Sequence, residues 1–348
     1  MAASSNGLLA YILRRTLLMI PTFLGVTVVV FVLCQFVPGG PMDQIIMAGA
    51  QASEGGEGGG SSSNRAGVSF SEKDLAALKA YYNFDKPIPV AYAQYLWNLA
   101  TLDLGMSFRY TRPVTEVIAQ RLPISIYYGI ITTILTYGIC IPLGVLKAIR
   151  HRTILDTGTS FLIFIGYAIP SYALGALLLT VLAVQYQIFP LAGFKGTDFE
   201  MLSTVGKIKN VVWHSILPLF CYMIGSFALM TMLVKNSLLD NLAADYVRTA
   251  MASGLSWRRA VLRHALRNSL IPLATSFGHN IGLLLAGSLL IERVFTIPGM
   301  GLLFYESITA RDYPVVMGLT AISAGLLLAG NLLSDLCVAA VDPRVRFQ

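Results

Sequence analysis

No aspartate, glutamate, lysine or arginine interrupts the stretch Thr16-Leu-Leu-Met-Ile-Pro-Thr-Phe-Leu-Gly-Val-Thr-Val-Val-Val-Phe-Val-Leu-Cys-Gln-Phe-Val37. This uncharged run continues to residue 42, and five more follow it: residues 122–146, 157–194, 211–234, 268–291 and 313–334. Each run has at least 22 residues, and a helix of that length crosses the hydrocarbon core of a bilayer. Over such lengths in lipid, a helix satisfies its own backbone hydrogen bonds. We therefore predict an all-α membrane protein with six transmembrane helices.

The composition supports a bilayer rather than water as the surroundings of these helices. Charged residues make up 12% of the chain and hydrophobic residues 55%, whereas a soluble domain carries about 25% charged residues. A large soluble helical core is the alternative interpretation. Six uncharged runs of this length are hard to reconcile with a water-facing surface.

The basic residues predict the orientation of the chain. With the N-terminus inside, the cytoplasmic segments hold 13 Lys and Arg residues against 5 acidic ones, so they account for the net charge of +7. Positive charge favours the cytoplasmic side. We expect a multi-pass protein of the bacterial inner (plasma) membrane with both termini in the cytoplasm. Anionic membrane lipid explains the basic face, so nucleic acid is not expected as a partner.

The N-terminus is predicted to be a span and not a cleaved signal. Arg14 and Arg15 precede an apolar run that is too long for the core of a signal peptide. That run also lacks a clear cleavage site of small residues.

Breaks in the apolar pattern predict four regions and place the spans. The regions are an N-terminal tail with the first span (1–37), a small helical extracytoplasmic insert (38–121), a core of spans 2–6 with a cytoplasmic loop at 236–268 (122–338), and a cytoplasmic tail (339–348). The spans themselves are expected at residues 12–37, 122–146, 161–184, 216–234, 270–291 and 315–338. Ile169 and Pro170 predict a kink in the third span. Residues 185–214 are expected to form an outer loop.

The insert carries a flexible segment and two predicted helices. Residues 53–64 have the Gly/Ser composition of a linker. A phosphate-binding loop is the alternative, but no strand precedes the segment and no Gly-Lys-Ser/Thr ends it. Ser71 is suited to cap a first helix, and after Pro87 and Pro89 an apolar stripe predicts a second. The aromatic residues of these helices fit lipid headgroups or a docking protein, and headgroups are favoured: Tyr81, Tyr82, Tyr92, Tyr95 and Trp97.

A basic amphipathic segment lies between the fourth and fifth predicted spans. It begins with Asp245-Tyr-Val-Arg-Thr-Ala-Met-Ala-Ser-Gly254 and continues through Arg263-His-Ala-Leu-Arg-Asn-Ser-Leu-Ile-Pro272. Asp240 is positioned to cap its helix, and Asp245 can pair with Arg248. Gly254 reaches positive φ at low cost, so it suits a reversal of the chain. Ser256 is expected to cap a second amphipathic helix, which has Trp257 and Ala265 on its apolar face. The segment therefore predicts two short helices joined at Gly254.

Two interpretations of this segment are open. An interfacial helix resting on anionic lipid would account for the arginines and for Trp257. Rigid coupling to a partner protein accounts better for a helix–glycine–helix unit held between two spans.

The same segment resembles the cytoplasmic loop of ABC-importer permeases, in the form found in dipeptide/oligopeptide permeases of the B type. The similarity is carried by Tyr246-Val-Arg-Thr-Ala250, by the pair Gly254–Leu255, and by Arg263-His-Ala-Leu-Arg-Asn268 before Ile271-Pro272. Asp245 stands where glutamate is usual. The more general Glu-Ala-Ala signature of such loops is matched only at Ala250 and Gly254.

The resemblance continues along nearly the whole chain. It includes Tyr11-Ile-Leu-Arg-Arg15, Asp103-Leu-Gly-Met-Ser-Phe108, Arg121-Leu-Pro123, Pro298-Gly-Met-Gly301, Ala310-Arg-Asp-Tyr-Pro314 and Asp342-Pro-Arg-Val-Arg346. The run Gly39-Gly-Pro-Met-Asp-Gln44, with the glycine-rich insert after it, is similar to the Yej-type branch. Members of that branch import peptides and the peptide-linked antibiotic microcin C.

The resemblance implies a type I-like permease bundle that forms the translocation path of an ATP-driven peptide importer. It implies a second paralogous permease, cytoplasmic ATP-binding subunits and an extracytoplasmic solute-binding protein as partners. The chain has no Gly-x4-Gly-Lys-Ser/Thr loop, so ATP and Mg are expected on the partner ATPase and no cofactor, catalytic residue or metal is expected on this chain. The residues expected to couple to the ATPase are Asp245, Tyr246, Arg248, Thr249, Ala250, Gly254, Leu255 and Arg263.

Candidates for the translocation path or a gate lie in and after the fifth predicted span. His279 and Asn280 fit helix–helix hydrogen bonding or the lining of a cavity. At the outer mouth the candidates are Glu292, Phe295, Pro298 and Gly299, and an ordinary tight loop is the alternative there.

Two other classes of membrane protein are weighed against the importer. An ion-coupled secondary transporter of small solutes usually carries acidic residues or lysine in mid-membrane, whereas here only Asp335 lies inside a predicted span, near its end. An intramembrane enzyme needs a catalytic set, and the four histidines are scattered. The cysteines have no paired spacing and are predicted to be small core residues: Cys34, Cys140, Cys221 and Cys337.

Overall fold

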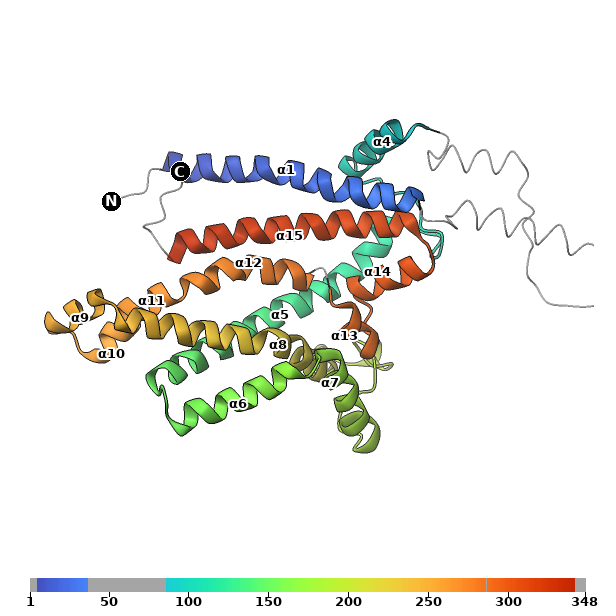
Figure 1. Ribbon diagram of the computed structural model, residues 1–348. Helices are drawn as coiled ribbons and strands as arrows, with labels where there is room; N and C mark the ends of the chain where they lie inside the picture. The colour runs from blue at the N-terminus through green and yellow to red at the C-terminus, as the bar shows by residue number, and fades with distance from the viewer. Residues whose placement is uncertain (1–4, 37–85, 286, 342–348) are drawn as a thin grey trace, which may run out of the picture. The chain divides into compact units, whose positions relative to one another are not determined.

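A computed structural model describes residues 5–36, 86–285 and 287–341, and helices dominate them (Figure 1). Within these ranges there is no β-strand, only an isolated bridge between Met106 and Pro113. The predicted all-α class is thereby confirmed. The flexible segment at 53–64 and the helix expected after Ser71 lie outside the described residues.

The chain divides into two compact units. The first contains Met1–Pro21, Arg121–Leu303 and Ser323–Gln348, and the second contains Thr22–Gln120 and Phe304–Ile322. The helices are α1 (Ser5–Phe36), α4 (Ile88–Ala100), α5 (Val114–Ile149), α6 (Ile154–Ala168), α7 (Ser171–Leu178), α8 (Thr204–Ala243), α9 (Asp245–Ala252), α10 (Trp257–Ala260), α11 (Leu266–Ser269), α12 (Ile271–Leu285), α13 (Leu289–Val294), α14 (Met300–Thr309) and α15 (Tyr313–Val341). Short π-helical turns occupy Leu179–Gln185 and Val261–Ala265, and a 3-10 turn occupies Phe199–Met201.

Four of the described helices are long and apolar enough to cross a membrane, and a bent pair brings the number to as many as five. The four correspond to Ala10–Phe36, Val114–Ile149, Thr204–Ala243 and Tyr313–Ala339. The bent pair is Ile154–Ala168 with Ser171–Gln185, whose axes differ by 91°. Ile169, which precedes Pro170, is extended with ψ 124°, as steric conflict with a following proline requires. The predicted kink is confirmed.

The fifth predicted span is not one continuous helix. α12 ends at Leu285, Gly287 has φ +89°, and α13 begins only at Leu289 after an extended Ser288. A search for uncharged runs could not reveal this break, because glycine and serine interrupt a helix without adding charge. The expected count of six spans is therefore not reached by continuous helices in the described residues.

The expected outer loop at residues 185–214 is partly helical, which corrects the prediction. α8 begins at Thr204, and Ser203 caps it by accepting a hydrogen bond from Gly206 N at 3.3 Å. An uncharged run marks only the apolar part of a helix, whereas lysines such as Lys207 and Lys209 can extend the helix beyond that part.

The first unit is held by apolar contacts and by two close glycines. One buried cluster contains Tyr128 of α5, Tyr222 of α8 and Phe295 beside α13. A Cβ on Gly278 or Gly330 would overlap the backbone carbonyl oxygen of the other, so α12 and α15 approach each other at backbone distance. Small residues permit such contacts between helices in membranes. Cys140 and Cys221 are buried in apolar clusters, as predicted for small core residues.

The second unit packs α4 against the later half of α1. The phenol of Tyr92 lies 3.0 Å from Thr27 Oγ1, and the ring of Phe31 lies 5.4 Å from Tyr92 and 5.7 Å from Tyr95. The second predicted helix of the insert is thus confirmed. Tyr92 and Tyr95 of this helix are half-buried within the unit, whereas Trp97 is 70% exposed.

Candidate coupling and gating sites

The helix that is predicted to contact a partner, α9, begins at Asp245, directly after α8 ends at Ala243. Ala244 is extended with ψ 146° and occupies the N-cap position of α9. The expectation that Asp240 caps this helix is wrong, because Asp240 lies within the last turns of α8. No side chain caps α9, so its start is fixed by the backbone turn and by packing.

α9 is fixed on one side and open on the other. Val247 is 1% exposed and packs with Leu238 of α8 and Ala148 of α5. Asp245 has a side chain that is 97% exposed and lies 3.8 Å from Arg248, so the predicted pair forms at long range. Tyr246, Thr249, Gly254 and Arg263 are also exposed, and Ala250 and Leu255 are half-buried. Most of the predicted coupling residues therefore lie on a free surface of this chain.

Gly254 reverses the chain as predicted. Its φ is +92°, a region that L-residues with side chains rarely adopt. Gly254 N donates to Met251 O at 3.0 Å and Leu255 N to Ala250 O at 3.2 Å, which satisfies the last carbonyl groups of α9. Ser256 stands at the N-cap of α10, also as predicted, although its side chain makes no capping hydrogen bond.

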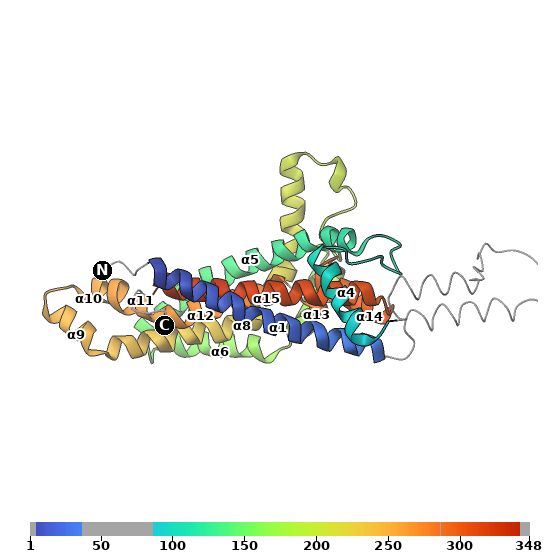
Figure 2. The same ribbon diagram turned by 90° about the horizontal axis from the view of Figure 1, so that it is seen from above.

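The second half of the loop forms a seat for the first half. Ala260 and Ala265 are buried with Val247 and Leu238, whereas Trp257 is 46% exposed. A π-helical turn at Val261–Ala265 widens the helix between α10 and α11. Ser269 Oγ donates to Ala265 O at 2.7 Å. The loop is thus a packed helical pair at one end of α8 and α12 (Figures 1 and 2).

The predicted gate residues form a turn around the buried carboxylate of Glu292, at the opposite end of α8 and α12 (Figure 1). Glu292 is 1% exposed, and its carboxylate accepts hydrogen bonds from Leu302 N at 2.7 Å, Ser288 N at 3.2 Å and Tyr222 OH at 3.3 Å. A Cβ on Gly299 would lie 2.5 Å from the carboxyl carbon, so any side chain there would displace the carboxylate from these hydrogen bonds.

Phe295 and Pro298 complete this turn. Phe295 is buried, and a Cβ on Gly175 of α7 would lie 2.9 Å from its ring. Phe295 O accepts a hydrogen bond from Gly193 N at 2.8 Å, and Pro298 is half-buried. The four predicted residues Glu292, Phe295, Pro298 and Gly299 therefore belong to one packed turn, which we call the Glu292 turn.

The two polar residues of the fifth predicted span lie in α12. Asn280 Nδ2 donates to Tyr137 OH of α5 at 3.5 Å, the long limit of a hydrogen bond. This contact favours the helix-packing interpretation of Asn280 over cavity lining. The structure does not describe the side chain of His279.

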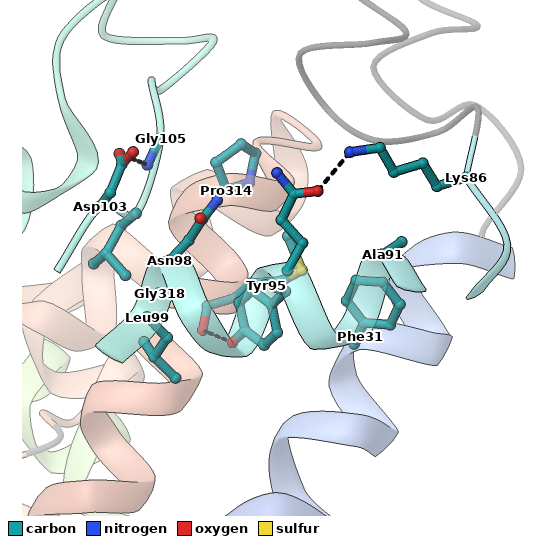
Figure 3. Close-up of a pocket in the computed structure, with 13 residues that line it drawn as sticks. Phe31, Lys86, Ala91, Tyr95, Asn98, Leu99, Asp103, Gly105, Pro314 and Gly318 are labelled. Carbon is teal, nitrogen blue, oxygen red and sulfur yellow. Dashed lines mark hydrogen bonds between the residues drawn. The ribbon is translucent and has the colours of Figure 1, made fainter. Parts of the chain in front are cut away.

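In the second unit, the segment that contains Asp103–Phe108 lies against the segment that contains Ala310–Pro314, and both carry the family resemblance. Ser107 Oγ donates to Asp312 Oδ2 at 2.5 Å, and Tyr110 OH donates to Glu306 Oε2 at 2.8 Å. A pocket of about 410 Å³ lies in the same unit (Figure 3). Lys86 Nζ donates to Gln94 Oε1 at 2.6 Å on one side of it, and Asp103 lies on another. In the described part of the chain, no cluster of three His, Cys, Asp or Glu residues could hold a metal ion.

Comparison with known proteins settles the family. Residues 140–347 match the family described as "Binding-protein-dependent transport system inner membrane component". The chain belongs to this family. The resemblance to ABC-importer permeases drawn from the loop motif is confirmed, and the uncharged helices are those of a multi-pass inner membrane protein.

Relatives of this inner membrane component align over nearly its whole length. The chain is 37% identical to the "Peptidoglycan transport system permease protein YejB" of Agrobacterium fabrum, covering 97% of this chain and 98% of the relative. It is 37% identical to the "Inner membrane ABC transporter permease protein YejB" of Escherichia coli O157:H7, with 97% and 99% covered. It is 38% identical to the "Oligopeptide transport system permease protein AppB" of Bacillus subtilis, again with 97% and 99% covered. The similarity to the Yej-type branch is therefore confirmed.

Sequence reasoning missed several buried polar groups of this inner membrane component. Lys147, Asp156 and Lys235 form a buried charged cluster between α5, α6 and α8. Their only signal in the sequence was position, since each borders an uncharged run. The partners of Glu292 were missed as well, because hydrogen bonds from backbone groups leave no trace in residue type.

Proposed function

We propose that the chain is the membrane-spanning permease subunit of an ATP-driven peptide importer, and that it couples to a separate ATPase through Asp245–Gly254. The observation that supports this proposal most directly is the way in which α9 is packed on one face and exposed on the other. One face is anchored by Val247, while Asp245, Arg248 and Thr249 are exposed. A short rigid helix of this kind suits a cleft in a partner protein and transmits displacement to the helices that hold it.

ATP hydrolysis and capture of the solute are assigned to other polypeptides. ATP and Mg bind to the partner ATPase, and this chain supplies the path and the coupling surface. We further propose a second paralogous permease, cytoplasmic ATP-binding subunits and an extracytoplasmic solute-binding protein as members of the complex. Relatives named as ABC transporter and peptide transport permeases support this assignment.

We propose six membrane crossings, with both termini and the loop at 236–268 in the cytoplasm and the insert at 38–121 outside. α12 and α13 together would make the fifth crossing. Within the first unit, Arg15 near the start of α1 pairs with Asp335 near the end of α15 at 2.9 Å, at the end of the unit where α9 and α10 lie (Figure 1). This arrangement supports a common side for the three segments.

The substrate class is proposed to be peptides, because the relatives are named for peptidoglycan, oligopeptide and dipeptide transport. The Glu292 turn is proposed to be a gate on the outer side of the path. Its firm internal hydrogen bonding supports movement as a rigid piece.

The experiment is to reconstitute the chain with candidate partners in liposomes and to measure ATP hydrolysis and peptide uptake together. We expect peptide to stimulate hydrolysis and uptake to require ATP. Uptake by the purified chain alone would contradict the proposal. Uptake that survives ATP depletion but stops when the proton gradient is lost would establish an ion-coupled secondary transporter instead.

A further inference from the structure

We propose that Lys147, Asp156 and Lys235 form a charged joint through which displacement of α9 reaches α5, α6 and α8 together. This inference rests on the proposed function, since it concerns how work from an ATPase is transmitted. The three are positioning residues, and they lie at the ends of α5 and α6 and in the later part of α8.

Both lysine ammonium groups of the joint lie within hydrogen-bonding or ion-pair distance of the carboxylate of Asp156. Lys235 Nζ lies 2.7 Å from Asp156 Oδ1 and 2.8 Å from Oδ2, and Lys147 Nζ lies 3.1 Å from Oδ1. The side chain of Lys147 is 0% exposed, that of Asp156 5% and that of Lys235 11%. One carboxylate therefore ties two helices, α5 and α8, to a third, α6.

Every donor of Lys147 is engaged. Its ammonium group donates to Asp156 O at 2.8 Å, to Thr159 Oγ1 at 2.8 Å and to Ser160 Oγ at 2.7 Å. Arg152 N donates to Asp156 Oδ2 at 3.2 Å, and His151 Nδ1 lies 3.3 Å from the same oxygen. Asp156 thus accepts hydrogen bonds from Lys235 and from Arg152 N and lies beside Lys147, so within this cluster its charge is balanced by protein groups. We therefore interpret the arrangement as a joint between helices.

Burial makes the joint stiff. Removing charges from water is costly, and their mutual attraction offsets that cost only while the geometry holds. A relative shift of α6 and α8 would separate Lys235 from Asp156 in a medium of low dielectric constant, where separation costs more than at the surface. The three helix ends therefore favour moving as one body over sliding past one another.

The joint is adjacent to the seat of α9. Ala148 follows Lys147 directly, and Leu238 lies one turn after Lys235. Both pack in one buried cluster with Val247 of α9 and with Ala260 and Ala265 of the second half of the loop. A push on α9 is thus delivered through Val247 to α5 and α8, and the joint extends it to α6, which carries no residue of that cluster.

Lys235→Met is the variant that tests the joint. It removes the link between α8 and α6 but leaves Asp156 paired with Lys147 and hydrogen-bonded to Arg152 N, so no charge is stranded. In the reconstituted complex we expect normal insertion and normal copurification of the ATPase. Peptide taken up per ATP hydrolysed should fall about fivefold or more, a size typical of coupling lost between sites.

Two further variants separate transmission from simple structural loss. Lys235→Arg restores a cation and should restore most of the uptake per ATP. Lys195→Met breaks an exposed ion pair of 2.7 Å with Glu200 and should leave uptake per ATP unchanged. These matched changes control for the loss of a lysine and of a salt bridge as such.

Each other result overturns part of the account. Unchanged uptake per ATP in Lys235→Met would overturn the joint alone. Failure of Lys235→Met to insert, or loss of the ATPase from its complex, would show that the charges serve folding or docking and not transmission. A wild-type complex without ATP-dependent uptake would overturn the proposed function, and the joint with it.

Discussion

The loop around α9 and the Glu292 turn lie in the same unit and both carry family motifs, but polar residues are exposed in the first and buried in the second. α9 keeps Asp245 and Arg248 in solvent and holds itself by the apolar side chain of Val247. The Glu292 turn buries its carboxylate and holds itself by hydrogen bonds from Leu302 N and Ser288 N. The polar residues of α9 can therefore contact a partner, whereas the carboxylate of the Glu292 turn stabilises the turn itself.

This difference predicts that substitutions in the Glu292 turn lower the stability of the protein, whereas substitutions in the α9 loop lower coupling to the ATPase. A buried carboxylate with backbone donors leaves those donors unsatisfied when it is removed. An exposed side chain leaves nothing unsatisfied, so its loss is felt only by a partner. Four substitutions test this contrast.

The largest effect is expected for Glu292→Ala. It strands the backbone N–H groups of Leu302 and Ser288 and leaves a cavity, which together cost about 3–5 kcal/mol. Thermal unfolding in detergent should show a large loss of stability or of folded yield. Glu200→Ala, at an exposed glutamate, is the matched control and should leave the melting temperature unchanged. Equal behaviour of the two variants would contradict the role given to the buried carboxylate.

The second effect is expected for Glu292→Gln. The amide keeps the length of the side chain but replaces one carboxylate oxygen by an NH₂ donor, which then faces the N–H group of Leu302 or of Ser288. One buried backbone donor loses its acceptor, at a cost of about 1–3 kcal/mol. The melting temperature should fall, but by less than in Glu292→Ala. An unchanged melting temperature in Glu292→Gln would contradict the role given to these two hydrogen bonds.

The third effect concerns α9 and appears in transport alone. Ala250→Glu adds a charge to the predicted docking face and should lower peptide-stimulated ATP hydrolysis and uptake by about tenfold, the cost of about 1.4 kcal/mol in docking. Membrane insertion and melting temperature should not change. Met201→Glu is the matched control, because it adds the same charge at a residue that is 94% exposed and lies outside the loop, and it should leave hydrolysis and uptake unchanged. Full transport by Ala250→Glu would exclude this face as the coupling surface.

The smallest effect on stability is expected for Arg248→Ala. The pair with Asp245 is exposed and 3.8 Å long, and pairs of this kind contribute about 0–1 kcal/mol. The melting temperature should stay within error of wild type, while affinity for the ATPase falls measurably in a pull-down at low salt. A marked loss of stability would mean that Arg248 has a role within this chain.

The main helices could be predicted from sequence because membrane spans require long uncharged runs. The kink before Pro170 and the reversal at Gly254 were predictable too, since proline and glycine restrict the backbone locally. The break at Gly287 and the true start of α8 at Thr204 were not, because they depend on packing rather than on charge.

The sites follow the same division. The exposed residues of α9 could be predicted from an amphipathic pattern and a family resemblance. The expected cap at Asp240 was wrong because α8 runs on through it to Ala243. The joint of Lys147, Asp156 and Lys235 joins residues up to 88 positions apart, which no local pattern reveals.

The central claim is that an ATPase works on this chain through α9. Thr249→Cys, introduced in place of an exposed residue of α9 in a background without the four native cysteines, tests it by crosslinking to the ATPase in the assembled complex. The account predicts a crosslink at Thr249→Cys whose yield changes when ATP is added, and none at the matched position Thr180→Cys of the first unit. A transport-competent complex with no crosslink at Thr249→Cys would contradict it.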